Sequence, residues 1–187
     1  MTETGFPYSA AKHARILILG SMPGRLSLAR RQYYAHPKNA FWPIMSRLLG
    51  IPAEASYETR LENLRKAGIA LWDVAHQCAR KGSMDHNIRL DSVIANDFAS
   101  FFRSHPQIGH LFFNGRKAAE LYRRLVLPGL PPALQHIPAT VLPSTSPAHA
   151  RLNLEQKILA WSVILKPLET AHGRPYEAPA SQIQPSS

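Results

Sequence analysis

The chain has 187 residues and a mass of 20.8 kDa, the size of one domain with a substantial core. Its 22 lysines and arginines outnumber its 12 acids, so the net charge is +10 and the pI is near 10.2, while 45% of the residues are hydrophobic. Its single cysteine, Cys78, excludes an internal disulfide, a multi-cysteine zinc site and an iron–sulfur cluster held by four cysteines of this chain.

Strand and helix patterns alternate along the sequence. Short apolar runs rich in β-branched or aromatic residues predict strands, and apolar residues spaced three and four apart predict helices. In chain order these are a strand at Arg15–Leu19, helices at Phe41–Leu49 and Tyr57–Lys66, a strand at Ile69–Val74, a helix at Asp91–Arg103, a strand at Ile108–Phe113, a helix at Arg116–Leu125, a strand at Ile137–Leu142 and a helix at Leu152–Leu165. Ser56 is placed to cap the second helix, and Gly50 and Gly68 stand where helices are expected to stop.

This alternation predicts an α/β fold with one domain, built on a four-stranded parallel sheet that is flanked by helices. We place the domain at residues 14–166. Residues 1–13 are expected to be an irregular lead-in, and residues 167–187, rich in Pro, Ser, Gln and Ala, a flexible tail. No apolar run approaches the roughly 18 residues that cross a bilayer, and the first 15 residues hold no secretory h-region, so we expect a cytoplasmic protein without a membrane segment.

The positive charge is concentrated in two stretches without acids. The first lies between Glu3 and Glu54 and contains Lys12, Arg15, Arg25, Arg30, Arg31, Lys38 and Arg47. The second runs from Leu121 to Leu154 and contains Arg123, Arg124 and Arg151. Such a surface suits a polyanion, although basic residues that only keep a protein in solution would give the same charge.

Polar or glycine-bearing segments follow all four predicted strands. They are Gly20-Ser21-Met22-Pro23-Gly24, Trp72-Asp73, Asn114-Gly115 and Pro143-Ser144-Thr145-Ser146-Pro147. In open α/β sheets, ligands bind beyond the carboxyl ends of the strands. The sequence therefore predicts a binding site at this rim of the sheet.

The segment GSMPGRLSLARRQYYAHPKNAFW, residues 20–42, combines several candidate groups. Its glycines permit a turn whose N–H groups face a ligand, but it has neither the phosphate-loop lysine nor the dinucleotide fingerprint. Tyr33 and Tyr34 offer a flat face for a base or pack in the core. Asn39 precedes the apolar Phe41-Trp42 pair, where a helix cap is the alternative to a chemical role.

The other strand ends leave similar alternatives open. Ser144 and Ser146 either hold a phosphate or make ordinary turns, and no GxSxG motif supports a serine hydrolase. Asp73 ends an apolar strand at the rim, where it either binds a ligand or forms an ion pair with an arginine. Asn114 has the same placement, with a turn beside Gly115 as its alternative. The nine histidines form no recognised metal spacing, so no metal site is predicted.

Taken together, GSMPG, YYAHPKNAFW and LPSTSPAHA resemble the signature motifs of the uracil-DNA glycosylase superfamily, and most closely those of the hypoxanthine (deoxyinosine) DNA glycosylase family. The resemblance spans about residues 15–165. It implies a four-stranded parallel sheet, no cofactor, and excision of a deaminated base from double-stranded DNA after base flipping. Two positions depart from related enzymes: Met22 stands where mismatch-specific uracil enzymes carry a catalytic asparagine, and Leu142 where some uracil enzymes carry a catalytic histidine.

The resemblance also implies roles for individual residues. Asn39 corresponds to the catalytic asparagine that positions water. Tyr34 would stack on the flipped base, and the remaining base-binding candidates are Asp73, Asn114, Gly20, Ser21 and Met22. The DNA-binding candidates are Ser144, Ser146, Ala148, His149, Arg30 and Lys38. We expect a monomer that acts on duplex DNA; a mismatch-specific uracil or thymine glycosylase, a free-nucleoside hydrolase and a non-catalytic nucleic-acid-binding module are the alternatives.

Overall fold

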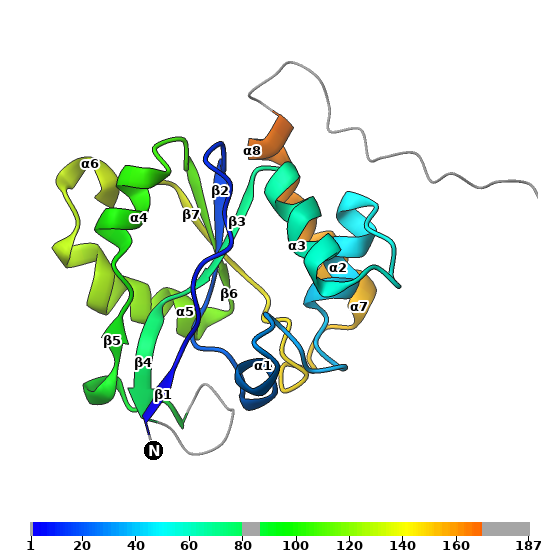
Figure 1. Cartoon of the computed structure of the whole chain (residues 1–187), viewed down its shortest axis with the longest axis horizontal. Helices are drawn as coiled ribbons and strands as arrows, with labels where there is room; N and C mark the ends of the chain where they lie inside the picture. The colour runs from blue at the N-terminus through cyan, green and yellow to red at the C-terminus, as the bar shows by residue number, and fades with distance from the viewer. Residues whose placement is uncertain (1, 80–86, 170–187) are drawn as a thin grey trace, which may run out of the picture.

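A four-stranded parallel sheet forms the centre of the molecule (Figure 1). In the computed structural model, which describes residues 2–79 and 87–169, its strands are β2 (Ile16–Gly20), β3 (Ile69–Asp73), β6 (His110–Asn114) and β7 (Ala139–Leu142). Their order across the sheet is β3-β2-β6-β7, and all three pairings are parallel. The predicted strands and the predicted fold class are confirmed, with each strand boundary within two residues of the expectation.

The register of the sheet brings the carboxyl ends of the strands to one level. Gly20 at the end of β2 pairs with Asp73 at the end of β3, and Asn114 at the end of β6 pairs with Leu142 at the end of β7. Every residue of β2 and β3 is buried, as expected of strands that are covered by helices on both faces. The segments that follow the strands are therefore adjacent in space.

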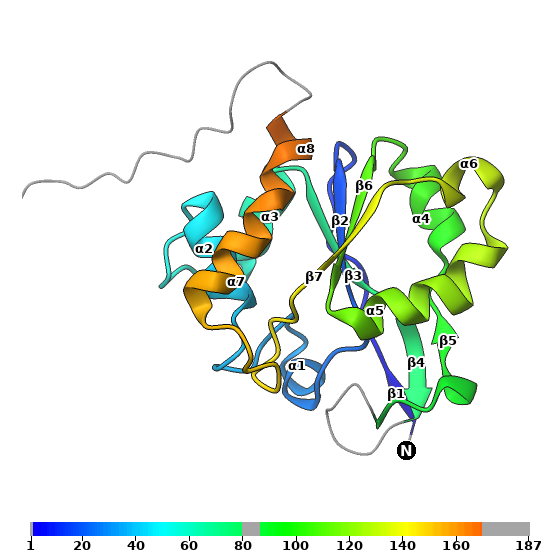
Figure 2. The same ribbon diagram turned by 180° about the vertical axis from the view of Figure 1, so that it is seen from behind.

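Helices cover both faces of the sheet (Figures 1 and 2). On one face, α2 (Phe41–Leu49), α3 (Tyr57–Lys66) and α7 (Leu154–Trp161) pack against Ile16 and Ile18. On the other, α4 (Phe98–Ser104) and α5 (Arg116–Leu121) pack against Leu17 and Leu19. This alternation follows from the two-residue period of a strand, and it divides the apolar core into two layers.

The helix signals read from the sequence are confirmed for α2 and α3, which have the predicted bounds. The Ser56 hydroxyl caps α3 by accepting a hydrogen bond from the Thr59 N–H at 3.2 Å. Gly50 ends α2 with a φ of 66°, and Gly68 follows α3 with a φ of 80°. Both glycines occupy the left-handed region that a residue with a Cβ enters only with strain.

The predicted helix at 91–103 is wrong in its first half. The chain there forms a short 3-10 turn, η2 (Leu90–Ser92), and a two-residue strand, β5 (Ile94–Ala95), before α4 begins. The Asp97 side chain caps α4 at the Ser100 N–H, and the Asn96 amide donates to the Asp73 carbonyl oxygen at 2.8 Å. These two contacts hold the residues before 98 in an extended path.

A second sheet and several short elements were not predicted from the sequence. The antiparallel sheet has the order β1-β4-β5, with β1 at Thr2–Thr4 and β4 at Ala75–Ala79. The other additions are α1 (Arg25–Arg30), a π-helical turn η3 (Tyr122–Val126) where the predicted helix at 116–125 continues, η4 (Leu127–Gly129), α6 (Pro132–Gln135), η5 (Ser162–Leu165) and α8 (Lys166–Glu169). None of the helices in the described ranges is long and apolar enough to cross a membrane.

Parts of the predicted lead-in and of the predicted tail pack against the domain. Within the expected lead-in, β1 belongs to the small sheet, Ser9 bridges to Leu71, and the Pro7 carbonyl accepts from the Tyr33 hydroxyl. At the other end, Leu168 in α8 is buried in the core, so the first residues of the expected tail belong to the fold. Residues 170–187 of that tail lie outside the described part of the chain.

Candidate active site

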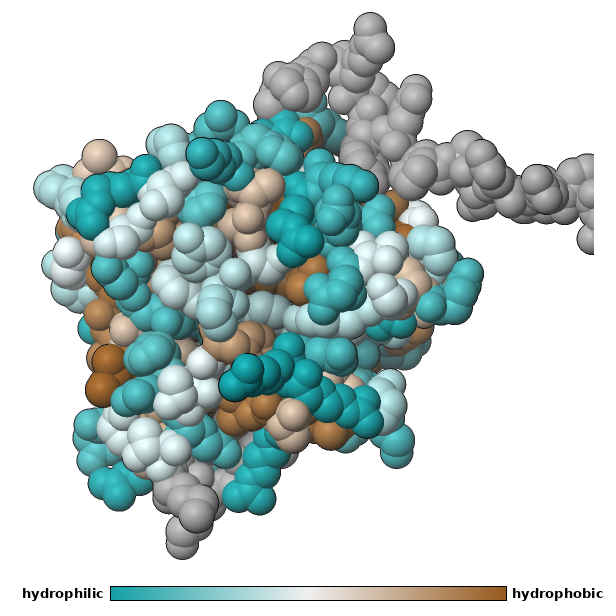
Figure 3. All heavy atoms as spheres, viewed as in Figure 1, coloured by the Kyte–Doolittle hydropathy of each residue, from teal (hydrophilic) through white to brown (hydrophobic). Residues whose placement is uncertain are grey.

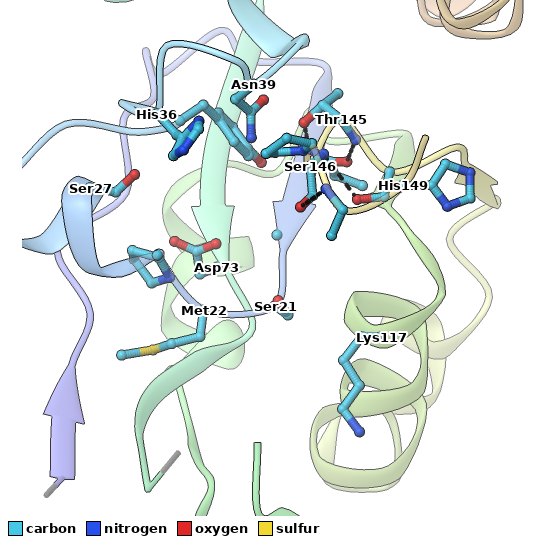
Figure 4. A pocket seen from close by; sticks show the side chains of 18 of the residues that line it. Ser21, Met22, Ser27, His36, Asn39, Asp73, Lys117, Thr145, Ser146 and His149 are labelled. Carbon is cyan, nitrogen blue, oxygen red and sulfur yellow. Dashed lines mark hydrogen bonds between the residues drawn. The ribbon is translucent and has the colours of Figure 1, made fainter. Parts of the chain in front are cut away.

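A cleft of about 830 Å³ opens at the carboxyl ends of the four parallel strands (Figure 4). Its walls come from residues 20–27 after β2, Asp73 at the end of β3, residues 114–120 after β6, residues 144–149 after β7, and residues 33–39 before α2. The segments that the sequence placed at one rim therefore enclose one volume.

Most of the residues singled out from the sequence line this cleft: Gly20, Ser21, Met22, Tyr34, Asn39, Asp73, Asn114, Ser144, Ser146, Ala148 and His149. Arg30 and Lys38 do not line it; both are exposed. The cleft is also lined by residues for which the sequence predicted no role, among them Ser27, His36, Arg116, Lys117, Glu120 and Thr145. No group of three or more histidine, cysteine or acidic side chains among the described residues is arranged to hold a metal ion.

Gly20 allows two polar groups to approach the backbone at the floor of the cleft. A Cβ atom added at Gly20 would lie 2.2 Å from Asp73 Oδ1 and 3.3 Å from the Tyr34 hydroxyl oxygen. The first distance is below any real Cβ contact, so a side chain at position 20 is incompatible with this placement of Asp73. The buried Asp73 carboxylate and the Tyr34 hydroxyl are thus held beside the end of β2.

The two neighbouring tyrosines have different surroundings. Tyr33 is buried in the core, where its N–H donates to the Tyr57 hydroxyl at 2.9 Å and its carbonyl accepts from the Trp42 indole at 2.9 Å. Burial, and then the nearby Asp73 charge, raise the pKa of Tyr33 well above its usual value. Tyr34 turns to the cleft with a left-handed φ of 55° and stacks on Phe41, with the ring centroids 4.0 Å apart. A positive φ at a bulky residue is strained and is typical of functional sites.

Asn39 makes a turn just before α2, whose N-cap is Ala40, and lines the cleft as well. Its Oδ1 accepts from the Phe41 N–H at 2.9 Å, and its own N–H donates to the His36 carbonyl at 2.8 Å. Because Oδ1 is held by that backbone donor, the amide nitrogen points toward the side of the cleft that holds Asp73 (Figure 4). The N-cap position that the sequence offered to Asn39 is therefore occupied by Ala40, while the Asn39 side chain keeps one backbone contact and its amide lines the cleft.

The Met22 side chain is directed away from the centre of the cleft. It is buried with Ala75, Cys78 and Ile88 in a small apolar cluster, and Figure 4 shows its thioether turned away from Asp73. What this residue offers a ligand is its backbone. Cys78, buried in the same cluster, packs as a small apolar residue.

The loop after β7 is attached to the end of β6 and to the start of α2. Asn114 and Thr145, both buried, exchange two hydrogen bonds, and the Thr145 carbonyl accepts from the Ala40 N–H at 2.9 Å. Gly115, with a φ of 92°, lets Ser144 approach so closely that an added Cβ would lie 3.1 Å from its Cβ. This geometry favours a positioning role for Asn114 over the predicted contact with a bound base.

Two side chains of α7 fasten the same loop from its other side. The Trp161 indole donates to the Pro143 carbonyl at 2.9 Å, and the Lys157 amine donates to the His149 carbonyl at 2.8 Å. Burial lowers the pKa of Lys157 from its usual value. The hydroxyls of Ser144 and Ser146 accept from the N–H groups of Ser146 and Ala148, so both serines make the predicted turns while they line the cleft.

Basic side chains surround the mouth of the cleft. Arg25, Arg116 and Lys117 line it, and the exposed Arg30 and Arg31 lie at the end of α1. Figure 3 shows a strip of hydrophilic surface across the part of the molecule that contains α1. An anionic ligand larger than the cleft would meet these side chains at its entrance.

Known proteins resemble this chain over most of its length. Residues 6–164 match the family model described as the uracil DNA glycosylase superfamily. A protein of Methanosarcina acetivorans named hypoxanthine DNA glycosylase is 34% identical over 167 residues, which cover 89% of this chain and 99% of the relative. One of the same name from Methanosarcina barkeri is 36% identical over 121 residues, 64% of this chain and 75% of the relative. A Methanosarcina acetivorans protein solved by solution NMR, and described as a candidate uracil DNA glycosylase, has a TM-score of 0.75 and 34% identity over 90% of this chain and 99% of its own.

Proposed function

The chain belongs to the uracil DNA glycosylase superfamily, and from this premise we propose that it is a repair enzyme that hydrolyses the N-glycosidic bond of hypoxanthine in DNA. Two relatives at 34% and 36% identity carry the name hypoxanthine DNA glycosylase. The observation that carries the proposal is the cleft itself, in which the Asp73 carboxylate, the Asn39 amide and the Tyr34 ring face one volume behind a basic entrance.

Base recognition follows from the groups at the floor of the cleft. Hypoxanthine presents a ring N–H donor beside a carbonyl acceptor. The ionised Asp73 carboxylate accepts from the ring N–H, and a donor from the backbone of residues 20–22 or from the Asn39 amide reaches the carbonyl. Phe41 supports one face of the Tyr34 ring, which leaves Tyr34 to stack on the flipped base.

In the chemical step, the bond between the sugar carbon and the base nitrogen breaks, and its electron pair leaves with the base. Asn39 holds a water molecule through the remaining lone pair of Oδ1, and the water oxygen bonds to the sugar carbon; the proton that this water loses ends, through solvent, on the departed base. The departing base carries that electron pair into a site of fixed N–H donors, where its charge is stabilised. A free base and an abasic site are the products.

The duplex is held by exposed basic side chains and by the loop after β7, which forms one wall of the cleft. Arg30 and Lys38 contact phosphates, and the loop at 144–149 contributes the Ser144 and Ser146 hydroxyls together with Ala148 and His149. The target nucleotide rotates out of the stack into the cleft. A single copy of the chain supplies both the pocket and the entrance, so we propose that it acts as a monomer.

The test uses duplexes that contain one inosine, uracil or xanthine, followed by alkali to cleave abasic products. We expect strand cleavage at inosine, and no release of hypoxanthine from free inosine under the same conditions. Cleavage at uracil alone would replace the proposal by a mismatch-specific uracil enzyme. Binding without cleavage at any base would indicate a non-catalytic module, and turnover of free inosine would indicate a nucleoside hydrolase.

A further inference from the structure

Glu120 is the only acid between Asp97 and Glu155 in the sequence, and it lines the cleft. It stands on α5, one turn after Lys117 and one turn before Arg124. Its Oε2 lies 3.2 Å from Lys117 Nζ, and its Oε1 lies 3.6 Å from Arg124 Nη1. One carboxylate is therefore shared between two cations at a cleft that Arg25 and Arg116 also line.

Lys117 differs from an ordinary surface lysine. Its side chain is 19% exposed, so water screens its charge less than that of a fully exposed lysine. Next to it, Arg116 is exposed at the cleft and makes no ion pair with any residue that the structure describes. A carboxylate and a phosphate are both anionic acceptors for an ammonium or a guanidinium group, so the two compete for the same cations.

We propose that Glu120 competes with DNA phosphates for Lys117 and Arg124, and so sets how tightly the cleft holds DNA. In the free protein the carboxylate neutralises these cations, and on docking a phosphate takes its place. When DNA leaves, the carboxylate again occupies the cations and favours dissociation. The competition needs only DNA binding, whereas its effect on the release of an abasic product rests on the proposed function.

The chain offers a matched control on α3. Glu62 there pairs with Lys66 at 3.2 Å and with Arg65 at 3.6 Å, so it also shares one carboxylate between two cations. Neither Glu62 nor its two partners lines the cleft. Glu120→Gln and Glu62→Gln remove the same charge from the same kind of pair, and they change the net charge of the protein equally.

The experiment measures the dissociation constant of both variants and of the parent protein for an undamaged duplex and for an abasic duplex at several salt concentrations. Exposed ion pairs change equilibrium constants by a factor of about 1.4 to 5, so we expect Glu120→Gln to bind both duplexes about two- to fivefold more tightly. The slope of log K for DNA association against log salt concentration should be steeper for Glu120→Gln than for the parent protein by up to about 0.9, which is the slope that one phosphate contact contributes. Lys117→Met should weaken binding, and Glu62→Gln should leave it unchanged.

Kinetics supply the second measurement. Because tighter binding slows release of the abasic product, the steady-state rate of Glu120→Gln should fall relative to its single-turnover rate. Unchanged or weaker DNA binding by Glu120→Gln would overturn the proposal, as would equal tightening by Glu62→Gln, which would indicate an effect of net charge. Tighter binding without excision of any base would uphold the competition and contradict the proposed function.

Discussion

Asn114 and Thr145 are joined by two hydrogen bonds that lock the loop after β7 to the end of β6. The Asn114 amide nitrogen donates to the Thr145 hydroxyl at 2.8 Å, and the Thr145 N–H donates to Asn114 Oδ1 at 2.9 Å. The two residues are 31 positions apart in the sequence. Because both are buried, this link fixes the wall of the cleft that carries Ser144 and Ser146.

Thr145→Val tests this link while it keeps the shape of the side chain. The variant leaves the buried Asn114 amide nitrogen without its acceptor, which should lower the free energy of unfolding by about 1–3 kcal/mol. The loop should also move, so the single-turnover excision rate should fall. Thr140→Val is the control, because its hydroxyl bonds His110 and it does not line the cleft. Equal excision rates for the two variants would contradict a positioning role.

Gly20→Ala tests the close approach at the floor of the cleft. The added Cβ would lie 2.2 Å from Asp73 Oδ1, so the carboxylate must move. A displacement of about 1 Å in a catalytic site is enough to lower a rate by about 10²-fold, and we expect a loss of at least that size in excision. Gly129→Ala is the control, since nothing lies within 4 Å of the Cβ it would add. Excision at the parent rate by Gly20→Ala would show that the position of Asp73 is unimportant.

Asp73 is predicted to govern which base is accepted. Asp73→Asn replaces an acceptor by a group that both donates and accepts, so the ratio of hypoxanthine to uracil excision should change more than DNA affinity does. Competition between two labelled duplexes in one reaction measures that ratio directly. Asp91→Asn, at an exposed residue paired with Arg89, controls for the loss of one negative charge. An unchanged ratio would assign Asp73 a purely structural role.

Alkaline pH should destabilise the protein through its buried tyrosines. Burial raises the pKa of Tyr33, Tyr57 and Tyr122, so the unfolded chain loses protons near pH 10 that the folded chain keeps. The contribution of these protonated tyrosines to the free energy of unfolding is therefore complete below about pH 10. Above that pH the free energy of unfolding falls, by up to about 1.4 kcal/mol per pH unit for each tyrosine.

Urea unfolding at pH 9, 10 and 11 measures this slope, and Tyr122→Phe isolates one contribution to it. The buried Tyr122 hydroxyl makes no hydrogen bond within the described ranges, so its removal should raise stability at pH 8 by about 1–3 kcal/mol. The variant should also lose stability less steeply above pH 10. A slope equal to that of the parent would show that Tyr122 ionises as easily in the folded chain as in the unfolded one.

Local signals were sufficient for the parts of the fold that depend on neighbours in sequence. Ser56, Gly50 and the apolar strands act on residues a few positions away, and their consequences are confirmed. The error at 91–103 has a distant cause, because Asn96 bonds the Asp73 carbonyl 23 residues earlier. No periodicity in the sequence could show that contact.

Some residues of the candidate site could likewise be predicted from the sequence, and others could not. Residues at the strand ends could be placed at the rim because a parallel sheet brings those ends together. The position of Glu120 at the cleft could not be predicted from the sequence, because it depends on which side of α5 faces the cleft. Asn39 shows a third case: the N-cap of α2 is Ala40, yet the Asn39 side chain accepts from the first N–H of the helix and lines the cleft, an arrangement that the sequence pattern does not distinguish from a cap.

The single-turnover rate of Asn39→Ser on a duplex with one inosine tests whether Asn39 acts in the chemical step. A serine hydroxyl also accepts from the N–H two residues on, so the variant keeps an acceptor for the Phe41 N–H, and its unfolding should match that of the parent within about 0.5 kcal/mol. It loses the amide that faces the cleft. We predict a fall in the excision rate of about 10²–10⁴, the contribution of a positioned catalytic group, with DNA affinity nearly unchanged. Excision at close to the parent rate by an equally stable variant would contradict the assignment of Asn39 to the chemical step.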